Sequence, residues 1–239
     1  MTDLPAAVLW DMDGTLVDTE PSWIAAEFAL VAAHGGTWTD ADAHALVGNP
    51  LPVSAEYLRA RGGVDLPVER IVDLLLDDVV RAVGERVPWR PGARELLLEL
   101  TDRGVPCALV TMSYRRLAEA VVAALPPGTF TALVTGDEVA HGKPHPEPYL
   151  TAAAAVGADP ADCVAIEDSG AGVASAEAAG VPVVAVPNVV PLDPGPGRVL
   201  LSTLDGVRAS DLAALADRVR AAGTDGGADG GEGQPEPRA

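Results

Sequence analysis

The segment AAVLWDMDGT, residues 6–15, joins an apolar run to a pair of carboxylates. The apolar residues 6–10 predict a short buried strand. Side chains two residues apart in an extended segment point the same way, so Asp11 and Asp13 are expected to face one small volume. Two carboxylates placed together repel unless a cation neutralises them or one is protonated. Gly14 permits a tight turn directly after the strand. Such an arrangement is costly in a structural turn and useful in a catalytic one.

Strands and helices alternate along much of the chain. Strands are expected at 6–11, 105–111, 132–135, 163–167, 182–186 and 199–202, and helices at 93–103, 114–124, 146–156, 171–179 and 210–221. This alternation is typical of βαβ units and predicts an α/β fold, a Rossmann-like parallel sheet with helices on both faces. Sheets of this kind bind ligands at the carboxyl ends of their strands. The aspartate pair falls at one of these ends.

The segment 19–88 breaks this alternation. It contains helical patterns at 22–33, 40–47, 53–61 and 67–83 and no convincing strand. We therefore expect a small all-helical domain at 19–88, inserted into an α/β core formed by 1–18 and 89–222. The linkers on either side of the insertion suggest that it opens and closes over the site. Residues 223–239 are rich in Gly, Asp, Glu and Pro, which predicts a disordered tail.

The overall composition limits the possible partners. The 239 residues carry a formal net charge of −19, which argues against binding to a nucleic-acid backbone. No apolar run approaches the length that spans a bilayer, and no secretory signal is visible, so we expect a cytoplasmic protein without membrane association. A monomer is the default expectation.

Four segments, taken in order, resemble the motifs of the haloacid dehalogenase superfamily. They are Asp11-x-Asp13-Gly14-Thr15, then Thr111 at the end of an apolar run, GKPHPEPY at 142–149 and VAIEDS at 164–169. The helical insertion and the segment DTEP at 18–21 resemble subfamily I, in the branch that holds β-phosphoglucomutase and hexose-phosphate phosphatases. The resemblance spans roughly residues 5–222.

This resemblance implies a role for each motif. Asp11 would be the nucleophile that forms an aspartyl-phosphate, and Asp13 the general acid and base. Thr111, with the backbone N–H groups of Met112 and Ser113, would cradle the phosphoryl oxygens. Lys143 would neutralise the phosphate and keep the nucleophile ionised.

The candidate metal ligands are all oxygens. They are the Asp11 carboxylate, the backbone carbonyl of Asp13, and Asp168, with Glu167 bound directly or through a water. Octahedral oxygen sites that retain waters suit Mg²⁺. The ion would also relieve the repulsion within the aspartate pair.

Two departures from the resemblance concern the type of reaction. Trp23 stands where the mutases of this branch carry a histidine, and the stretch VGNPL at 47–51 lacks their cap arginine. Both departures favour hydrolysis of the phosphate ester over phosphosugar mutase activity. Trp23 either contacts substrate or packs the first inserted helix, and Arg115 either reaches the substrate or is a surface cation. Both questions stay open at this point.

The sequence therefore predicts a Mg²⁺-dependent phosphatase that hydrolyses small phosphomonoesters, such as sugar or polyol phosphates, through an aspartyl-phosphate. Its partner would be a small phosphorylated metabolite. One alternative is a phosphosugar mutase of the β-phosphoglucomutase type. Another is an inactive phosphometabolite-binding protein on the same scaffold.

Overall fold

The computed structural model describes residues 4–225. Its last helix, α9 (Ala209–Asp225), includes residues 223–225, which were expected to begin the tail. Helix α9 therefore ends three residues after the expected core boundary at 222. The rest of the expected tail, 226–239, lies outside the described residues.

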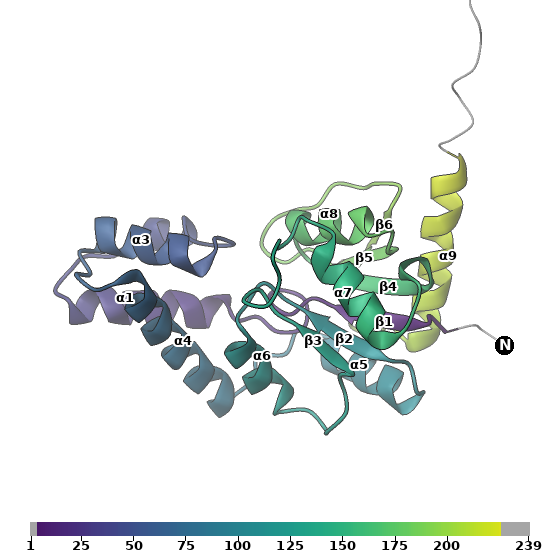
Figure 1. The fold of residues 1–239 in the computed structure, drawn as a ribbon, viewed down its shortest axis with the longest axis horizontal. Coiled ribbons are helices and arrows are strands. Elements are labelled where there is room, and N and C mark those ends of the chain that lie inside the picture. Colours follow the sequence, from purple (N-terminus) through teal and green to yellow (C-terminus); the bar gives the residue numbers. More distant parts are fainter. Residues whose placement is uncertain (1–3, 226–239) are drawn as a thin grey trace, which may run out of the picture.

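A six-stranded parallel sheet forms the centre of the molecule (Figure 1). The strand order is β3-β2-β1-β4-β5-β6, and every neighbouring pair runs parallel. The strands are β1 (Ala7–Trp10), β2 (Cys107–Val110), β3 (Ala132–Val134), β4 (Cys163–Glu167), β5 (Val183–Ala185) and β6 (Arg198–Leu200). The expected parallel α/β sheet is confirmed.

Helices cover both faces of the sheet because successive residues of the fully buried strands point to opposite sides. From β1, Val8 and Trp10 pack with α5 (Ala93–Asp102), α6 (Arg115–Val122) and α9. Ala7 and Leu9 pack on the other side with α7 (Glu147–Val156) and α8 (Gly170–Ala178). A short 3₁₀ helix, η1 (Pro160–Asp162), leads into β4 and was not expected from the sequence.

Four helices stand between β1 and β2 in the chain and lie to one side of the sheet (Figure 1). They are α1 (Glu20–Ala33), α2 (Asp40–His44), α3 (Leu51–Gly62) and α4 (Val68–Glu85). Both α1 and α3 pack against α4, and α4 also packs against α6 of the sheet's own helices. Helix α2 is shorter than the expected 40–47 and ends at His44.

The two segments that connect these four helices to the sheet are paired with each other. The Asp18 N–H donates to the Pro88 carbonyl at 2.9 Å, and the Arg90 N–H donates to the Leu16 carbonyl at 3.0 Å. An antiparallel bridge joins Val17 to Trp89 between them. The connection is therefore a two-stranded one rather than two independent tethers.

Within residues 4–225, no helix has both the length and the apolar character that a bilayer crossing requires.

Candidate active site

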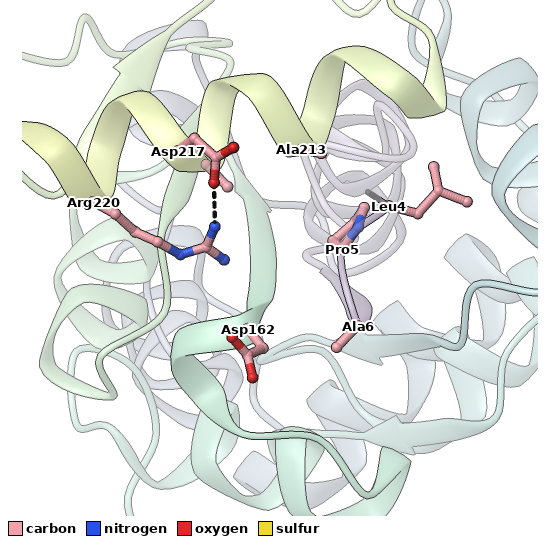
Figure 2. A pocket seen from close by; sticks show the side chains of 8 residues that line it. Leu4, Pro5, Ala6, Asp162, Ala213, Asp217 and Arg220 are labelled. Atoms are coloured by element: carbon pink, nitrogen blue, oxygen red, sulfur yellow. Dashed lines mark hydrogen bonds and ion pairs between the residues drawn. The ribbon is translucent and has the colours of Figure 1, made fainter. Parts of the chain in front are cut away.

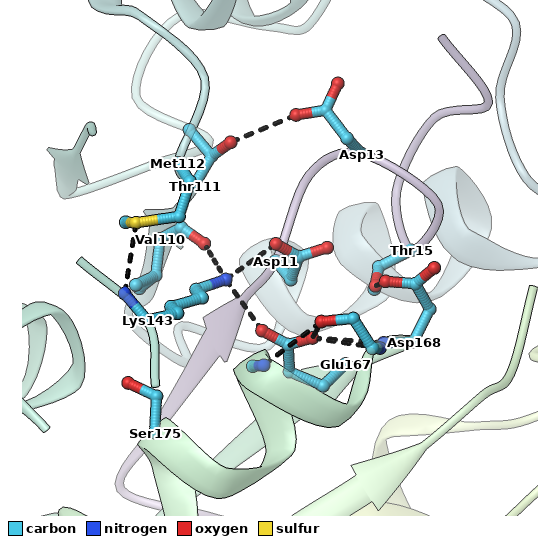
Figure 3. Close-up of polar contacts among 12 residues, drawn as sticks. Asp11, Asp13, Thr15, Val110, Thr111, Met112, Lys143, Glu167, Asp168 and Ser175 are labelled. Atoms are coloured by element: carbon cyan, nitrogen blue, oxygen red, sulfur yellow. Dashed lines mark hydrogen bonds and ion pairs between the residues drawn. The ribbon is translucent and has the colours of Figure 1, made fainter. Parts of the chain in front are cut away.

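The motif residues meet where the central strands end (Figure 3). Asp11 follows β1, Thr111 follows β2, and Glu167 is the last residue of β4. Strand β1 lies between β2 and β4, which is the switch point of the sheet, where ligands bind in open α/β folds. Lys143 reaches the same place from the loop between β3 and α7.

Lys143 is a buried cation between two carboxylates. Its Nζ donates to Asp11 Oδ1 at 2.7 Å, to Glu167 Oε1 at 2.6 Å and to the Val110 carbonyl at 2.8 Å. Its side chain is only 4% exposed. The ammonium thus has three acceptors, which a buried charge requires. The structure brings Lys143 to the nucleophile candidate, as the third motif predicted.

Glu167 holds Lys143 in place and is itself fully buried. The buried Tyr149 donates its hydroxyl to Glu167 Oε1 at 2.7 Å, and the Ser169 hydroxyl donates to Oε2 at 3.2 Å. A Cβ on Gly172 of α8 would lie about 2 Å from the Glu167 carboxyl atoms, so a larger residue there would displace this carboxyl group. Tyr149 belongs to the lysine motif, but no role was predicted for it from the sequence.

Burial shifts the proton equilibria of these groups. Burial and the Glu167 carboxylate raise the pKa of Asp11 well above its ordinary value, while Lys143 lowers it. Burial, followed by Glu167, raises the pKa of Asp168 to about 7. Burial alone would lower the pKa of Lys143, but Asp11 and Glu167 outweigh it and raise this pKa. The excess of negative charge therefore favours a further cation at this edge of the sheet.

Asp13 turns toward the end of β2 rather than toward Lys143 (Figure 3). Its Oδ2 accepts hydrogen bonds from the hydroxyls of Thr111 at 3.1 Å and Ser113 at 2.8 Å. Its Oδ1 accepts one from the Thr19 hydroxyl. Thr19 precedes α1, so the acid/base candidate contacts the connection to the inserted helices. Thr19 was not predicted as a site residue from the sequence.

The oxygens beside Asp11 fit a divalent metal. Carboxylate oxygens of Asp11, Glu167 and Asp168 lie within 4.8 Å of one another. Asp11 Oδ2 is buried and has no hydrogen-bond partner among the described residues. A Cβ on Gly14, whose φ is +91°, would lie 2.1 Å from Asp168 Oδ2, so the turn after β1 is built around Asp168. An orphaned carboxylate oxygen within a set of hard oxygen donors matches what Mg²⁺ requires.

Two of the expected phosphate-binding groups, the Thr111 hydroxyl and the Ser113 N–H, are engaged with the protein. The Ser113 N–H donates to the Thr111 hydroxyl at 3.0 Å, so it would have to leave this hydroxyl to bind a phosphoryl oxygen. Met112 Sδ lies 3.2 Å from the Lys143 backbone nitrogen and accepts its N–H. The sequence placed these residues at the right strand end but could not show how their polar atoms pair.

Arg115 and Trp23 do not join this constellation through any hydrogen bond in residues 4–225. The Arg115 guanidinium contacts Glu138 and donates to the Leu133 carbonyl at 3.1 Å. This pairing does not support the expected contact of Arg115 with substrate. Trp23 is partly buried and packs against the hydrophobic core that contains Val8 and Trp10, in agreement with the packing interpretation.

A separate cavity of about 300 Å³ lies beside the residues that precede β1 and β4 (Figure 2). Arg220 of α9 forms part of its wall and donates to Asp217 at 2.8 Å and to the Ala161 carbonyl. Leu4, Pro5 and Ala6 line the opposite side. None of the motif residues lines this cavity, so the candidate active site is the edge at Asp11.

The model of the haloacid dehalogenase-like hydrolase family matches residues 5–180. The chain belongs to this family of hydrolases, which confirms the resemblance to the haloacid dehalogenase superfamily. Its relatives confirm the placement in subfamily I.

Hexitol phosphatase B of Escherichia coli (strain K12) is 30% identical over 184 residues, covering 76% of this chain and 83% of that protein. The phosphorylated carbohydrates phosphatase of Thermotoga maritima is 31% identical over 180 residues, covering 73% and 82%. Among solved structures, a CbbY mutant from Rhodobacter sphaeroides in complex with xylulose-(1,5)bisphosphate superimposes with a TM-score of 0.76. It is 26% identical, and the match covers 85% of this chain and 96% of that one.

Proposed function

We propose that this protein is a Mg²⁺-dependent phosphatase of small phosphomonoesters, with sugar or polyol phosphates as the substrate class. The observation that carries the proposal is the Asp11 carboxylate. One of its oxygens is held by buried Lys143, and the other is buried without a partner near Asp168. The names of two relatives, a hexitol phosphatase and a phosphorylated carbohydrates phosphatase, support the substrate class.

The Asp11 carboxylate, the Asp13 backbone carbonyl and Asp168 would hold the metal, with Glu167 bound to it directly or through a water. When bound, Mg²⁺ supplies positive charge that neutralises the phosphoryl oxygens. Both Glu167 oxygens already accept hydrogen bonds from protein donors, which favours the water-mediated arrangement.

The chain's own residues account for both chemical steps. An Asp11 carboxylate oxygen attacks phosphorus, the bond from phosphorus to the ester oxygen breaks, and Asp13 gives its proton to the leaving alkoxide. Asp13 then takes a proton from water as that water attacks the phosphorus of the aspartyl-phosphate. Inorganic phosphate leaves and the Asp11 carboxylate is restored. Lys143 offsets the negative charge throughout, and such positioning and neutralisation supply most of the catalysis in phosphoryl transfer.

We also propose that residues 19–88, with helices α1–α4, act as a cap over this edge, and that 1–18 and 89–222 form the core. The paired connection at Val17 and Trp89 and the bond between Thr19 and Asp13 support this division. Closure of a cap would exclude bulk water from the reacting phosphate.

A phosphosugar mutase remains the rival function within the same chemistry. Such an enzyme must grip a second phosphate, and the stretch at 47–51 offers no cation for it. The Asn49 amide in this stretch donates to the Ala45 carbonyl at 3.1 Å. The lack of a cationic residue at 47–51 supports hydrolysis over transfer between two positions of a sugar.

Release of inorganic phosphate from a panel of sugar and polyol phosphates tests the proposal. We expect Mg²⁺-dependent release by the wild type and none by Asp11→Asn. Asp65→Asn, which makes the same change on an exposed loop, should retain full activity. Isomer conversion without phosphate release would establish the mutase instead, and activity of Asp11→Asn close to wild type would overturn the mechanism.

A further inference from the structure

A second cluster of ligand-type side chains lies where the loop between β3 and α7 meets the first residue of α7. It consists of His141, His145 and Glu147, whose ligand atoms all lie within 4.8 Å of one another. The Nδ1 atoms of His141 and His145 lie 2.8 Å and 4.0 Å from Glu147 Oε2. Ligands of one zinc ion lie at most about 4.2 Å apart, twice the metal–ligand distance. Both distances fall within that limit.

The carboxylate of this cluster is already oriented by the backbone. Glu147 Oε1 accepts the Ala140 N–H at 2.7 Å, and Oε2 accepts the His141 N–H at 3.0 Å. The hydrogen bond from His141, followed by that from the Ala140 N–H, lowers the pKa of the Glu147 carboxyl. The carboxylate is therefore ionised and fixed in direction, as a metal ligand needs to be.

The two imidazoles are placed together and face solvent. Their ring centroids lie 4.6 Å apart, and the side chains of His141 and His145 are 65% and 51% exposed. The Glu147 N–H donates to His145 Nδ1 at 3.2 Å. His145 would therefore bind a metal through Nε2, or through Nδ1 once this hydrogen bond is broken. Two of the four histidines of the chain thus converge on one carboxylate.

We propose that His141, His145 and Glu147 form a second metal site, specific for a divalent transition ion such as Zn²⁺. Two imidazoles and one carboxylate suit zinc, whereas Mg²⁺ prefers an all-oxygen set. Three protein ligands leave the fourth tetrahedral position to water. The net charge of −19 raises the local concentration of cations around the chain.

The site shares its loop with Lys143, which lies between the two histidines in the sequence. A bound ion would link residues on both sides of Lys143. It would thereby restrict the motion of the loop that positions Lys143 beside Asp11. The site is independent of the proposed phosphatase function, because its ligands are not those of the all-oxygen set.

Zinc binding to the full chain in the presence of excess Mg²⁺ tests this site. Zn²⁺ stoichiometry is measured by isothermal titration calorimetry on the wild type, the double variant His141→Ala/His145→Ala, Glu147→Gln and His44→Ala. His44 is the matched control, an exposed histidine that lies on α2. Co²⁺ in place of Zn²⁺ adds a visible absorption spectrum that reports nitrogen ligation. Far-UV circular dichroism verifies that each variant is folded.

We expect the double variant to bind one Zn²⁺ equivalent fewer than the wild type and to lose the Co²⁺ absorption. Glu147→Gln should weaken the same site, and His44→Ala should leave it intact. Equal stoichiometry in the wild type and the double variant would overturn the proposal. An equal loss in His44→Ala would also overturn it, because it would show adventitious binding to surface histidines.

Discussion

At the scale of single residues, the site is governed by how its carboxylates are neutralised. Asp11, Glu167 and Asp168 gather at one strand edge, and buried Lys143 is the cation that pairs with the first two. Asp13 is kept apart from this group by three hydroxyl donors. The two aspartates therefore differ in environment: Asp11 is paired with a charge, and Asp13, the proposed general acid and base, is held by hydroxyl groups.

Replacing Asp13 by Asn should separate the two chemical steps. General acid–base catalysis contributes about 10²–10⁴-fold, so kcat for alkyl phosphates should fall by that factor. With p-nitrophenyl phosphate, whose leaving group needs no proton, a burst of p-nitrophenol should precede slow turnover. Stopped-flow absorbance measures the burst. A steady-state kcat close to that of wild type would contradict the role of Asp13.

Replacing Tyr149 by Phe should destabilise the protein. The change removes the hydroxyl that donates to the buried Glu167 carboxylate at 2.7 Å. Hydrogen bonds to charged groups contribute about 1.5–3 kcal/mol, so the free energy of unfolding should fall by about that amount. Urea unfolding measures it, with Tyr57→Phe on the surface of α3 as the control. Equal losses in the two variants would show that the hydrogen bond from Tyr149 to Glu167 contributes no more to stability than the hydroxyl of a surface tyrosine.

The residues of the site were predictable where a motif fixed their type and their place at a strand end. Asp11, Lys143 and Glu167 meet as expected for that reason. The partners of Arg115 were not predictable, because its contact with Glu138 joins the start of α6 to the loop after β3, and their approach depends on the packing of α6 beside β3. Tyr149 was overlooked because an aromatic residue in a helix usually signals core packing.

At the scale of elements, the periodic helices and apolar strands agree with expectation within a few residues. Pro106 explains why β2 starts at Cys107 rather than at 105, since proline has no N–H for the ladder. Helix α9 extends past the expected boundary. The glycine-rich composition that begins at residue 223 did not predict where this helix ends.

Helix α1 contains a buried carboxyl that should make stability depend on pH. Trp38 Nε1 donates to Glu27 Oε2 at 3.2 Å, and burial raises the pKa of Glu27 from 4.5 to about 7. The folded protein then holds a proton that the unfolded chain releases, so its stability should fall as pH rises from about 4.5 to about 7. Glu27→Gln removes this titration.

Urea unfolding at pH 5 and pH 8 measures the effect. Relative to wild type, Glu27→Gln should have a higher free energy of unfolding at pH 8 than at pH 5. Glu56→Gln, an exposed glutamate on α3, should give the same difference at both pH values. Parallel behaviour of the two variants would contradict the assignment of Glu27.

At the scale of the whole molecule, the four inserted helices and their connections contact the core in several places. These include the paired connection, the hydrogen bond from Thr19 to Asp13, and the packing of α4 against α6. An ion pair between Asp77 and Arg116 joins α4 to α6, and both side chains are half exposed. Opening of the proposed cap must break the packing of α4 against α6 and can retain the paired connection.

Asp77→Asn should therefore favour the open form slightly. An exposed ion pair contributes about 0–1 kcal/mol, so the open fraction should rise by at most about fivefold. Small-angle scattering without ligand should show a larger radius of gyration. Asp78→Asn is the matched control, because Asp78 pairs with Arg81 within α4. A single radius of gyration for all variants, with and without ligand, would contradict cap motion.

The central claim is that Asp11 carries the phosphoryl group. Rapid quench of the Mg²⁺-loaded protein with a turned-over substrate, followed by peptide mass spectrometry, tests it most directly. We predict one phosphoryl group on the peptide that contains Asp11, enriched in Asp13→Asn and absent in Asp11→Asn. Turnover with no phosphorylated Asp11, or a phosphoryl group on another residue, would contradict the account.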